Sequence, residues 1–442
     1  MDTRKISGQA APGRAGGQPT GTSGRGLGAR PGRGIGGRRG RAPLAIALAG
    51  VVLVVLVGVF ALASRAPAAS SSPPPSGLGA ASPISAVSAS PGTGSSGASP
   101  AGSGSGGAFA SLHPPGGDDL GYLTSLNELA ATVARAKAGQ EPAACAVRAL
   151  LDWAATAVAE KAHPSNPLLI AGTTGPFVDD TARAYGLALA WAVSGKEAYA
   201  EAASAIVNAW VSETRSLADA CPTGGECQTS LVVGRAAPGF VFAVDLIAGS
   251  PAWTHENDTA FRAWLRDVIL PAASLRDNNW GDAGLLLRAT AARFLGDAAG
   301  FEAAMADWRR RIDLIEPDGS IPEETRRGDA GIQYTQEALL YKVAVARIAE
   351  RQGIDLWSTK GAKGGSLKAA LGLLADYWQH PEDWPFDPHA SLPDPAPLWE
   401  IAYAHWQEPA YARILLTDRP NGPDGHSSVR WTTLTSGILA KP

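Results

Sequence analysis

The sequence predicts an all-α domain of the α/α-toroid type, and three observations support this fold class. Apolar residues recur at three- and four-residue spacing from Leu120 onward, which is the period of an amphipathic helix. Strand-like alternation is hard to find, since β-branched runs such as 231–233 are short and lie within helical periodicity. About ten such segments are joined by short loops, and antiparallel helix pairs of this kind can form a toroid, or incomplete barrel, around a central cleft.

The expected helices follow one another from residue 123 to residue 406. Gly195 separates two of them as a C-terminal stop. No motif recurs at the period of a regular solenoid, although a divergent solenoid remains an alternative. The longest irregular connection, 380–397, is rich in Pro and is interpreted as a lid or a cleft wall. The expected helical segments are 123–137, 143–161, 180–194, 197–213, 230–247, 257–269, 279–295, 298–315, 331–352, 367–378 and 399–406.

The front of the chain differs in composition from this domain. Residues 1–41 carry nine Lys or Arg and one acid, about +8, with almost no large apolar side chain, which predicts a disordered basic tail. Residues 44–63 are 20 consecutive small or apolar residues, long enough to span a bilayer as one helix. Arginines cluster just before this segment and few charges follow it, so the tail is expected in the cytoplasm and the domain outside.

Residues 65–118 are expected to link this single membrane helix to the domain 119–442. Between 66 and 117 there is no Asp, Glu, Lys or Arg, and Ser, Gly, Pro and Ala dominate, as in a flexible spacer. Cleavage near residue 63 is the alternative, and it would release a secreted domain. Residues 66–442 carry about −12, so the folded part has no basic footprint for nucleic acid.

Cysteine and histidine usage limits the chemistry. Three Cys exclude a disulfide-dense scaffold. Cys221 and Cys227 flank a polar loop and are expected to form a small disulfide; a C-x5-C metal pair is the alternative, but it lacks companion ligands nearby. Cys145 lies on an apolar helix face and is expected to be a buried free thiol. The sequence lacks the G-x-S-x-G nucleophile elbow, which makes a serine hydrolase unlikely. It also lacks a zinc-binding His pair and a phosphate-binding loop, so neither a metal nor a cofactor is expected.

Three segments stand out as candidates for chemistry: 177–185, 277–282 and 318–327, the last followed by Tyr334 seven residues after Arg327. Each also has an ordinary structural interpretation. The Asn pair in the second segment can cap a helix. The Pro-Glu-Glu-Thr run of the third segment and the acids of the first favour helix N-termini whatever the function.

Together these segments resemble the alginate lyase family of polysaccharide lyases, whose catalytic domains are α/α toroids. The family has Asn-Asn-His near a helix start, an Asp-Gly-x-x-Pro turn, a basic run, a Tyr seven residues beyond its key Arg, and Gly-x-Asp-Leu at the end of that helix. The resemblance is clearest over 276–356, and it weakly includes 144–153 and 183–187. The counterparts here are Asn278-Asn279-Trp280, Asp318-Gly319-Ser320-Ile321-Pro322, Arg326-Arg327, Tyr334 and Gly353-Ile354-Asp355-Leu356. Trp280 stands where the family has His.

The resemblance implies β-elimination on an acidic polysaccharide that contains uronic acid. This reaction removes the C5 proton and breaks the bond to O4, so donors must first neutralise the neighbouring carboxylate. Asn279 and Arg327 are the expected donors, because an amide adds no charge and a guanidinium binds a carboxylate bidentately. Tyr334 is the expected catalytic acid and base, with Arg327 as the positive neighbour that a phenol needs for this work.

Five further residues are expected to bind substrate. Asn278 adjoins the expected donor. Trp280 either stacks on a sugar ring or fills the core, and Arg183 either binds substrate or pairs with a nearby Asp. Arg326 adds local positive charge, which an anionic polymer requires of a domain that is acidic overall. His426, in a late Gly-His-Ser loop, is the other His expected near the cleft.

Two other functions remain open from the sequence. An inverting glycoside hydrolase on a similar toroid would use two carboxylates, with Asp179, Glu323 and Glu324 as the available acids. A non-catalytic polysaccharide-binding protein would keep the toroid without the family His. Elimination products absorb in the ultraviolet, hydrolysis products do not, and a binding protein yields no products.

Overall fold

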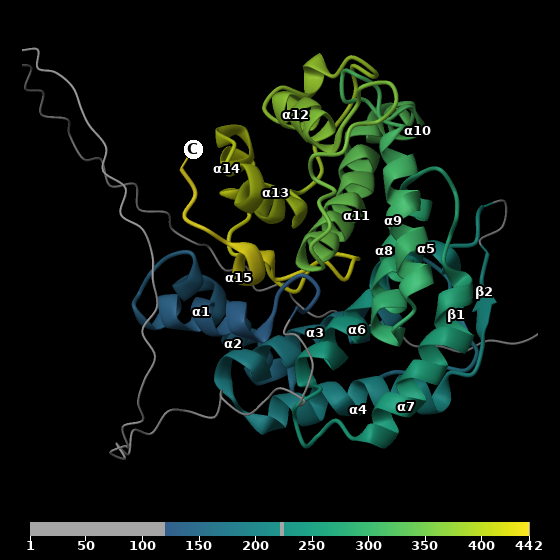
Figure 1. Cartoon of the computed structure of the whole chain (residues 1–442), viewed down its shortest axis with the longest axis vertical. Coiled ribbons are helices and arrows are strands. Elements are labelled where there is room, and N and C mark those ends of the chain that lie inside the picture. The colour runs from purple at the N-terminus through teal and green to yellow at the C-terminus, as the bar shows by residue number, and fades with distance from the viewer. Residues whose placement is uncertain (1–119, 222–224, 442) are drawn as a thin grey trace, which may run out of the picture. The chain divides into compact units, whose positions relative to one another are not determined.

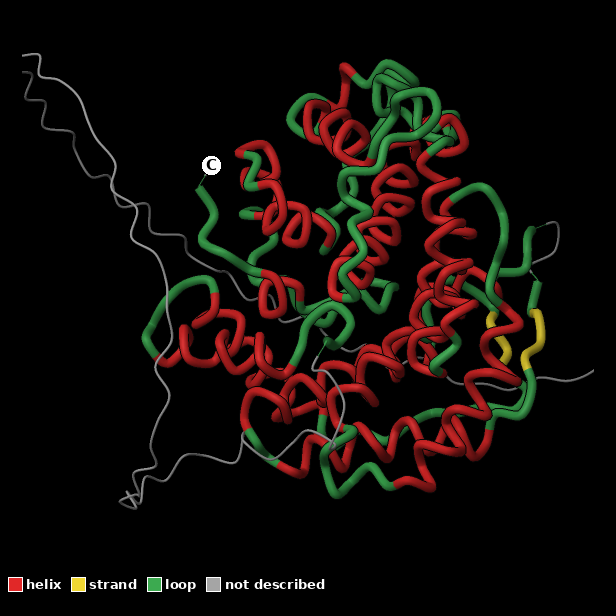
Figure 2. Tube along the Cα trace, in the orientation of Figure 1, coloured by secondary structure: helices red, strands yellow, loops and turns green. Residues whose placement is uncertain are grey.

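The computed structural model describes residues 120–221 and 225–441 (Figures 1 and 2). The predicted basic tail 1–41, the apolar segment 44–63 and the linker 65–118 lie outside the described residues. Within them, one stretch, Thr229–Ile247, has the length and mean hydropathy of a membrane-spanning helix. That stretch is 89% buried within the domain, so it has the character of a core segment.

The described part of the chain is mostly helical, as the sequence predicts. Figure 1 labels the elements in chain order. The helices are α1 (Leu126–Lys137), α2 (Ala143–Ala157), α3 (Pro176–Ser194), α4 (Glu197–Glu213), α5 (Thr229–Ala236), α6 (Pro238–Ile247), α7 (His255–Trp264), α8 (Asn279–Leu295), α9 (Ala298–Ile312), α10 (Pro322–Thr325), α11 (Gly331–Arg351), α12 (Leu367–Tyr377), α13 (Leu398–Trp406), α14 (Pro409–Leu415) and α15 (Thr432–Ser436). The strands are β1 (Leu168–Ile170) and β2 (Leu217–Asp219).

The helices form an inner ring with partners packed outside it, which fits an α/α toroid (Figure 1). Going round the ring, α3 packs on α6, α6 on α8, α8 on α11 and α11 on α13, and α15 and α1 complete the circuit back to α3. Helices α4, α9 and α12 pack against α3, α8 and α11 respectively. The inner helices α3, α8 and α11 are buried along most of their length, whereas α9 buries one face.

The structure differs from the sequence prediction in its short elements. The expected helix 230–247 is two helices, α5 and α6, because Pro238 opens a new helix and lacks the N–H that a continuous one needs. The expected helix 257–269 ends in a π-helical turn, Leu265–Ile269, just before Pro271. The two strands, each of three residues, pair in parallel. They were not expected from the sequence because three residues are too few to show an alternating period.

Candidate active site

Helix α8 begins at the Asn pair that the sequence singles out. Asn278 is the N-cap, and its side-chain Oδ1 accepts a hydrogen bond from the Trp280 N–H at 3.1 Å. The backbone at Arg276, just before the helix, packs directly against Gly281 in its first turn. A side chain at position 281 would not fit, since its Cβ would lie 1.6 Å from the Arg276 carbonyl oxygen. The structure therefore gives Asn278 a capping role.

Asn279 links α8 to α10 and α11 and is fully buried. Its backbone N–H donates to Glu324 Oε1 at 2.6 Å, and its side-chain Nδ2 donates to Glu337 Oε2 at 2.9 Å. Its Oδ1 has no hydrogen-bond partner among the described residues. The Asn279 amide therefore holds Glu337 in place, and its role as a donor to the substrate carboxylate stays a prediction.

Glu337 is the centre of this cluster. Its Oε1 accepts hydrogen bonds from Arg235 Nη1 at 3.1 Å and from the Tyr341 hydroxyl at 3.3 Å. Arg235 is buried and also donates to the Thr173 carbonyl. Burial raises the pKa of Tyr341 well above its usual value, and the neighbouring Glu337 charge acts in the same direction, so Tyr341 remains a donor. The Glu337 side chain is 17% exposed, so the cluster is not fully closed off from solvent.

Arg327 and Tyr334 form the solvent-reaching part of the site. The Arg327 guanidinium carbon lies 4.5 Å from the centre of the Tyr334 ring, within cation–π range. Both side chains are partly exposed. Tyr334 and Glu337 are three residues apart on α11 and therefore share one face of that helix. The Arg327–Tyr334 pair that the sequence identified therefore lies on the same side of α11 as Glu337.

Glu324 lies beneath Arg327 and is fully buried in α10. Burial raises the pKa of its carboxyl to about 7, and the negative Asp282 adds to the effect. The Asn279 N–H, Lys342 and Arg327 act in the opposite direction. Its Oε2 is 4.0 Å from Arg327 Nε and has no hydrogen-bond partner among the described residues. Glu324 therefore changes charge near neutral pH directly behind the Arg327–Tyr334 pair.

His426 lies on the loop between α14 and α15, which docks on α5 beside the cluster. Two residues along this loop, the Ser428 N–H donates to the Arg235 carbonyl at 2.7 Å. Arg430 fixes the loop from within by donating to the Ser427 carbonyl at 2.6 Å. Part of the His426 side chain is exposed, but loss of water around the imidazole lowers its pKa. The positive charges of Arg235 and Arg430 also lower this pKa, whereas the negative charge of Glu337 raises it. The imidazole is therefore neutral near pH 7.

Three other residues predicted to bind substrate have different surroundings. Trp280 is 6% exposed, and the Arg276 guanidinium carbon lies 4.3 Å from its ring, so it packs in the core and offers little surface for a sugar. Arg183 is buried and is occupied by internal ion pairs, to Asp180 at 2.6 Å and to Glu160 at 2.8 Å.

Arg326 is exposed and forms an ion pair with Glu323 in the same turn. This pairing reduces the positive charge that was expected from Arg326. Of the substrate-binding residues predicted beyond the donors and Tyr334, His426 is the one whose loop docks on α5 at Arg235, the partner of Glu337.

Sequence reasoning missed Arg235, Glu337 and Tyr341. Glu337 and Tyr341 had a detectable signal, since they stand three and seven residues after Tyr334 and thus on the same face of one helix. Arg235 had none, because its partner Glu337 is 102 residues away in the chain.

The structure also shows the state of the cysteines and of the residues that could bind a metal ion. The structure joins Cys221 and Cys227 in a disulfide, as the sequence predicts. Cys145 is a free thiol as expected, but it is half-buried and not fully buried. Across residues 120–221 and 225–441, no group of three or more His, Cys, Asp or Glu is arranged to hold a metal ion.

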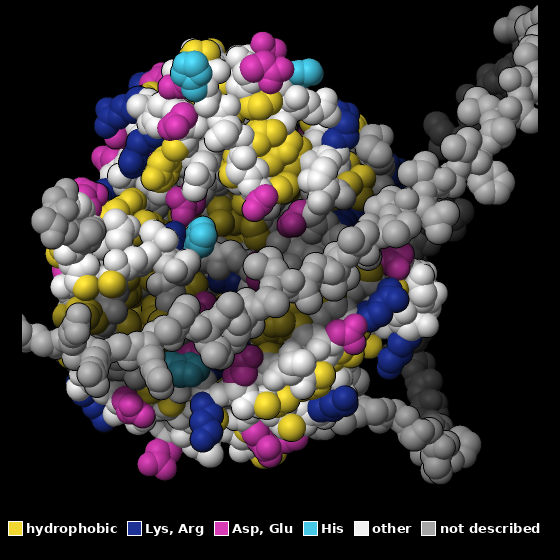
Figure 3. Space-filling model, turned by 180° about the vertical axis from the view of Figure 1, so that it is seen from behind, with side chains coloured by type: hydrophobic (Ala, Val, Ile, Leu, Met, Phe, Trp, Pro, Cys, Tyr) yellow, Lys and Arg dark blue, Asp and Glu magenta, His cyan; other side chains and the backbone are white. Residues whose placement is uncertain are grey.

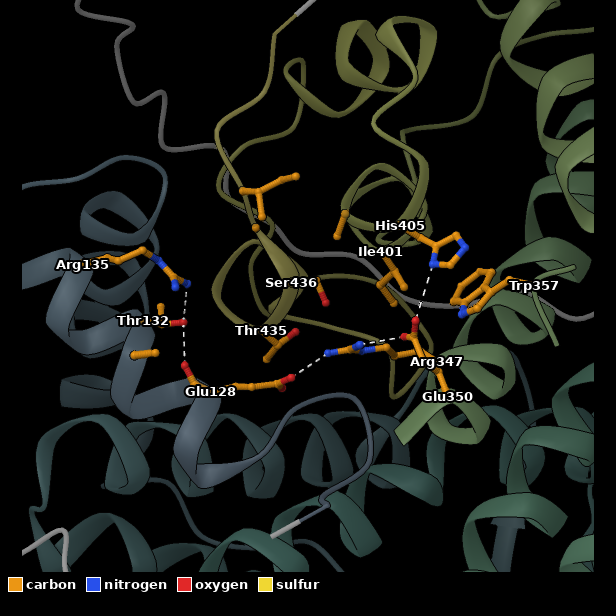
Figure 4. Close-up of a pocket in the computed structure, with 14 residues that line it drawn as sticks. Glu128, Thr132, Arg135, Arg347, Glu350, Trp357, Ile401, His405, Thr435 and Ser436 are labelled. Atoms are coloured by element: carbon orange, nitrogen blue, oxygen red, sulfur yellow. Dashed lines mark hydrogen bonds and ion pairs between the residues drawn. The ribbon is translucent and has the colours of Figure 1, made fainter. Parts of the chain in front are cut away.

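A separate pocket of about 340 Å³ lies at the far end of α11, where α1, α13 and α15 meet (Figure 4). Its charged side chains are already paired: Arg347 binds Glu128 and Glu350, and His405 lies 3.5 Å from Glu350. The Arg327–Tyr334 pair beside Glu337 reaches solvent, and the acidic neighbour of Arg327 is Glu324, 4.0 Å away with a pKa raised to about 7, so this cluster is the better candidate for chemistry. Figure 3 shows acidic and basic side chains interspersed around a hollow on one face of the molecule.

The fold and the site together define an α/α-toroid protein whose inner helices carry an Arg–Tyr pair beside a buried polar cluster. The model of the family described as alginate lyase matches residues 133–384. The chain therefore belongs to the alginate lyase family, a family of polysaccharide lyases.

Known proteins similar to this chain agree with that assignment. A polysaccharide lyase of Stenotrophomonas maltophilia (strain K279a) is 34% identical over 88 residues, which span 19% of this chain and 26% of that protein. The crystal structure of an alginate lyase from Bacteroides ovatus aligns with a TM-score of 0.56 at 19% identity over 72% of this chain and 99% of its own. Alginate lyase A1-III from Sphingomonas species A1 aligns with a TM-score of 0.59 at 17% identity, over 74% and 97% of the two chains. These structural likenesses concern the fold.

Proposed function

We propose that this protein is a membrane-anchored lyase that cleaves a uronic-acid-containing polysaccharide outside the cytoplasm by β-elimination. The single observation that carries the reaction type is the Arg327–Tyr334 pair, which is in cation–π contact and has the seven-residue spacing on which the resemblance to the family rests. The substrate class has support from a relative: two variants of the Sphingomonas lyase have been solved with a bound tetrasaccharide.

In the proposed reaction, Arg327 binds the uronate carboxylate at the cleavage site. Its guanidinium neutralises charge that otherwise opposes loss of the C5 proton, and this charge grows as the C5–H bond breaks. The electron pair of that bond forms the C4–C5 double bond, and the bond from C4 to O4 breaks. Glu337 does not oppose carboxylate binding strongly, because Arg235, Asn279 and Tyr341 already hold its charge.

Tyr334 then donates its phenolic proton to the leaving O4. The Arg327 guanidinium lies over the ring, where its positive charge stabilises the negative charge that develops during this transfer. The family resemblance also gives Tyr334 the role of base at C5, as one Tyr can serve both steps on one face of the sugar. Asn279 and Glu337 hold α8 and α11 in register beneath this pair.

The acidity of the chain is the main physical argument against an anionic substrate. Residues 66–442 carry about −12, which repels a polyanion at long range. The local charge at Arg327 acts over a few ångströms and is therefore less screened by salt than the long-range repulsion. Added salt up to about 0.15 M is consequently expected to raise kcat/KM on a uronate polymer.

The membrane anchor and the location are proposed from the sequence. The 20 apolar residues at 44–63, preceded by arginines and followed by an uncharged spacer, support a single span with the domain outside. A signal-peptidase site near residue 63 is the competing interpretation. Fractionation of cells that express the full chain, with protease added from outside, separates a membrane-bound form from a secreted one.

The experiment for the reaction type is a screen of the purified protein against alginate, glucuronan, heparinoids and chondroitin. Ultraviolet absorbance from an unsaturated uronate product is expected on at least one polymer, and Tyr334→Phe is expected to abolish it while polymer binding persists. Reducing ends without absorbance would instead indicate a hydrolase. Full activity of the Tyr334→Phe variant would contradict the role of Tyr334.

A further inference from the structure

The position of Trp280 leaves the site without the imidazole that the family carries at that place. Trp280 is buried against Arg276 and its indole has no basic nitrogen, so this position of α8 presents no base. Tyr334 alone would then have to take the C5 proton and protonate O4. A second proton-transfer group near the Glu337 carboxylate would remove this requirement.

The loop between α14 and α15 brings such a group to the cluster. The Ser428 N–H bonds to the Arg235 carbonyl at 2.7 Å, so this loop is docked on α5 at the residue whose guanidinium binds Glu337. Arg430 bonds to the Ser427 carbonyl at 2.6 Å and to the Gly425 carbonyl at 2.5 Å, which holds the loop on both sides of His426. His426 itself remains exposed to solvent.

We propose that His426, delivered by this loop, is the general base that takes the C5 proton, and that Tyr334 acts as the acid at O4. This inference rests on the proposed lyase function. The balance is complete without another reactant: the C5 proton moves to the imidazole, the C–H electron pair becomes the C4–C5 double bond, the C4–O4 bond breaks, and O4 receives the Tyr334 proton. Proton exchange with water then removes the proton from His426 and returns one to Tyr334.

The charges around His426 suit a base that works near neutral pH. Partial burial, together with Arg235 and Arg430, lowers its pKa, so the ring is neutral and able to accept a proton. Glu337 acts in the opposite direction and stabilises the imidazolium once the proton has been taken. Arg235 on α5, Glu337 on α11 and Arg430 on the loop itself are the charged groups that act on this ring.

The test uses the full chain and the polymer that gives the largest absorbance change with the wild type. His426→Gln is expected to lower kcat about 100-fold or more, the usual size of a general-base contribution, with KM changed little. His255→Gln is the matched control, because His255 is exposed at the start of the outer helix α7, and its activity should equal that of the wild type.

Two further readouts separate a base from a residue that only supports the loop. Added imidazole should restore activity to His426→Ala but not to Tyr334→Phe. The wild-type kcat/KM should fall as the pH drops through the lowered pKa of His426, and His426→Gln should lack this acid limb. Rescue together with loss of the limb would support the proposal.

Activity of His426→Gln within about twofold of the wild type would overturn the proposal and leave Tyr334 with both steps. A loss of activity without imidazole rescue and with the acid limb retained would also overturn it, because the residue would then be structural. Absence of an unsaturated product from the wild type on every polymer would instead remove the lyase function on which the inference rests.

Discussion

Replacement of Glu324 by Gln tests the electrostatics behind the Arg327–Tyr334 pair. Glu324 is fully buried and binds the Asn279 N–H at 2.6 Å, and Gln retains a carbonyl oxygen that can accept this bond. Gln cannot ionise, however. The variant therefore removes the one property that the structure identifies as unfavourable, namely a carboxylate charge in a buried place with Asp282 nearby.

The magnitude follows from the pKa of Glu324, which is raised from 4.5 to about 7 in the folded protein. A group with a raised folded-state pKa stabilises the fold fully below its unfolded pKa, and this stability is lost as the pH rises through the folded value. The full difference is about 3 kcal/mol, and most of it falls between pH 5 and pH 8. Relative to the wild type, Glu324→Gln should thus gain about 2–3 kcal/mol of unfolding free energy over this range.

Urea unfolding followed by tryptophan fluorescence at pH 5, 6, 7 and 8 measures this difference, since all 13 Trp belong to the domain. Glu323→Gln is the matched control: its side chain is 40% exposed, so the same comparison should change by less than about 0.5 kcal/mol. A difference between Glu324→Gln and wild type that stays constant within about 1 kcal/mol from pH 5 to pH 8 would refute the reasoning.

Three further predictions follow from the site and the disulfide. Arg327→Gln should lower kcat/KM by about 10²–10³-fold while unfolding in urea like the wild type, because it removes a donor to developing charge at a partly exposed position; equal activity would exclude Arg327 from the site. Glu337→Ala should cost about 3 kcal/mol in urea unfolding, because buried Arg235 loses its carboxylate, and an unchanged midpoint would show that the pair is dispensable. Reduction of the Cys221–Cys227 disulfide should lower the unfolding free energy by about 2 kcal/mol, as expected for closing a small loop, and thermal scans with and without reductant should agree if the bond contributes nothing.

The helices could be predicted from the sequence because their apolar period is long and regular. Helices α4 and α8 begin and end at the expected residues, and Gly195, with a φ of 69°, ends α3 as a C-terminal glycine should. The apolar period did not reveal the helix break before Pro238, because apolar residues continue across it. Three-residue strands and five-residue helices such as α15 contain too few positions to show any period.

The part of the site that depends on local spacing was also predictable. Arg327 and Tyr334 are seven residues apart, and the structure brings their side chains into contact. The groups beneath them were not predictable, because Asn279 meets Glu337 across 58 residues of chain. Local patterns do not encode such pairs, and they cannot distinguish a buried amide that positions its neighbours from one that touches substrate. For Arg183, the pairing with Asp180 was one of the alternatives offered by the sequence, because the two residues are three apart, whereas the Glu160 partner becomes clear only in the folded structure.

The central claim is that this chain breaks a uronate polymer by elimination through Tyr334. The most direct measurement is the time course of ultraviolet absorbance when purified wild-type protein and Tyr334→Phe act on the same polymer, with the products weighed by mass spectrometry. Unsaturated products, one water lighter than hydrolysis products, should form with the wild type and not with Tyr334→Phe. Saturated products from the wild type, or equal rates from the two proteins, would contradict the claim.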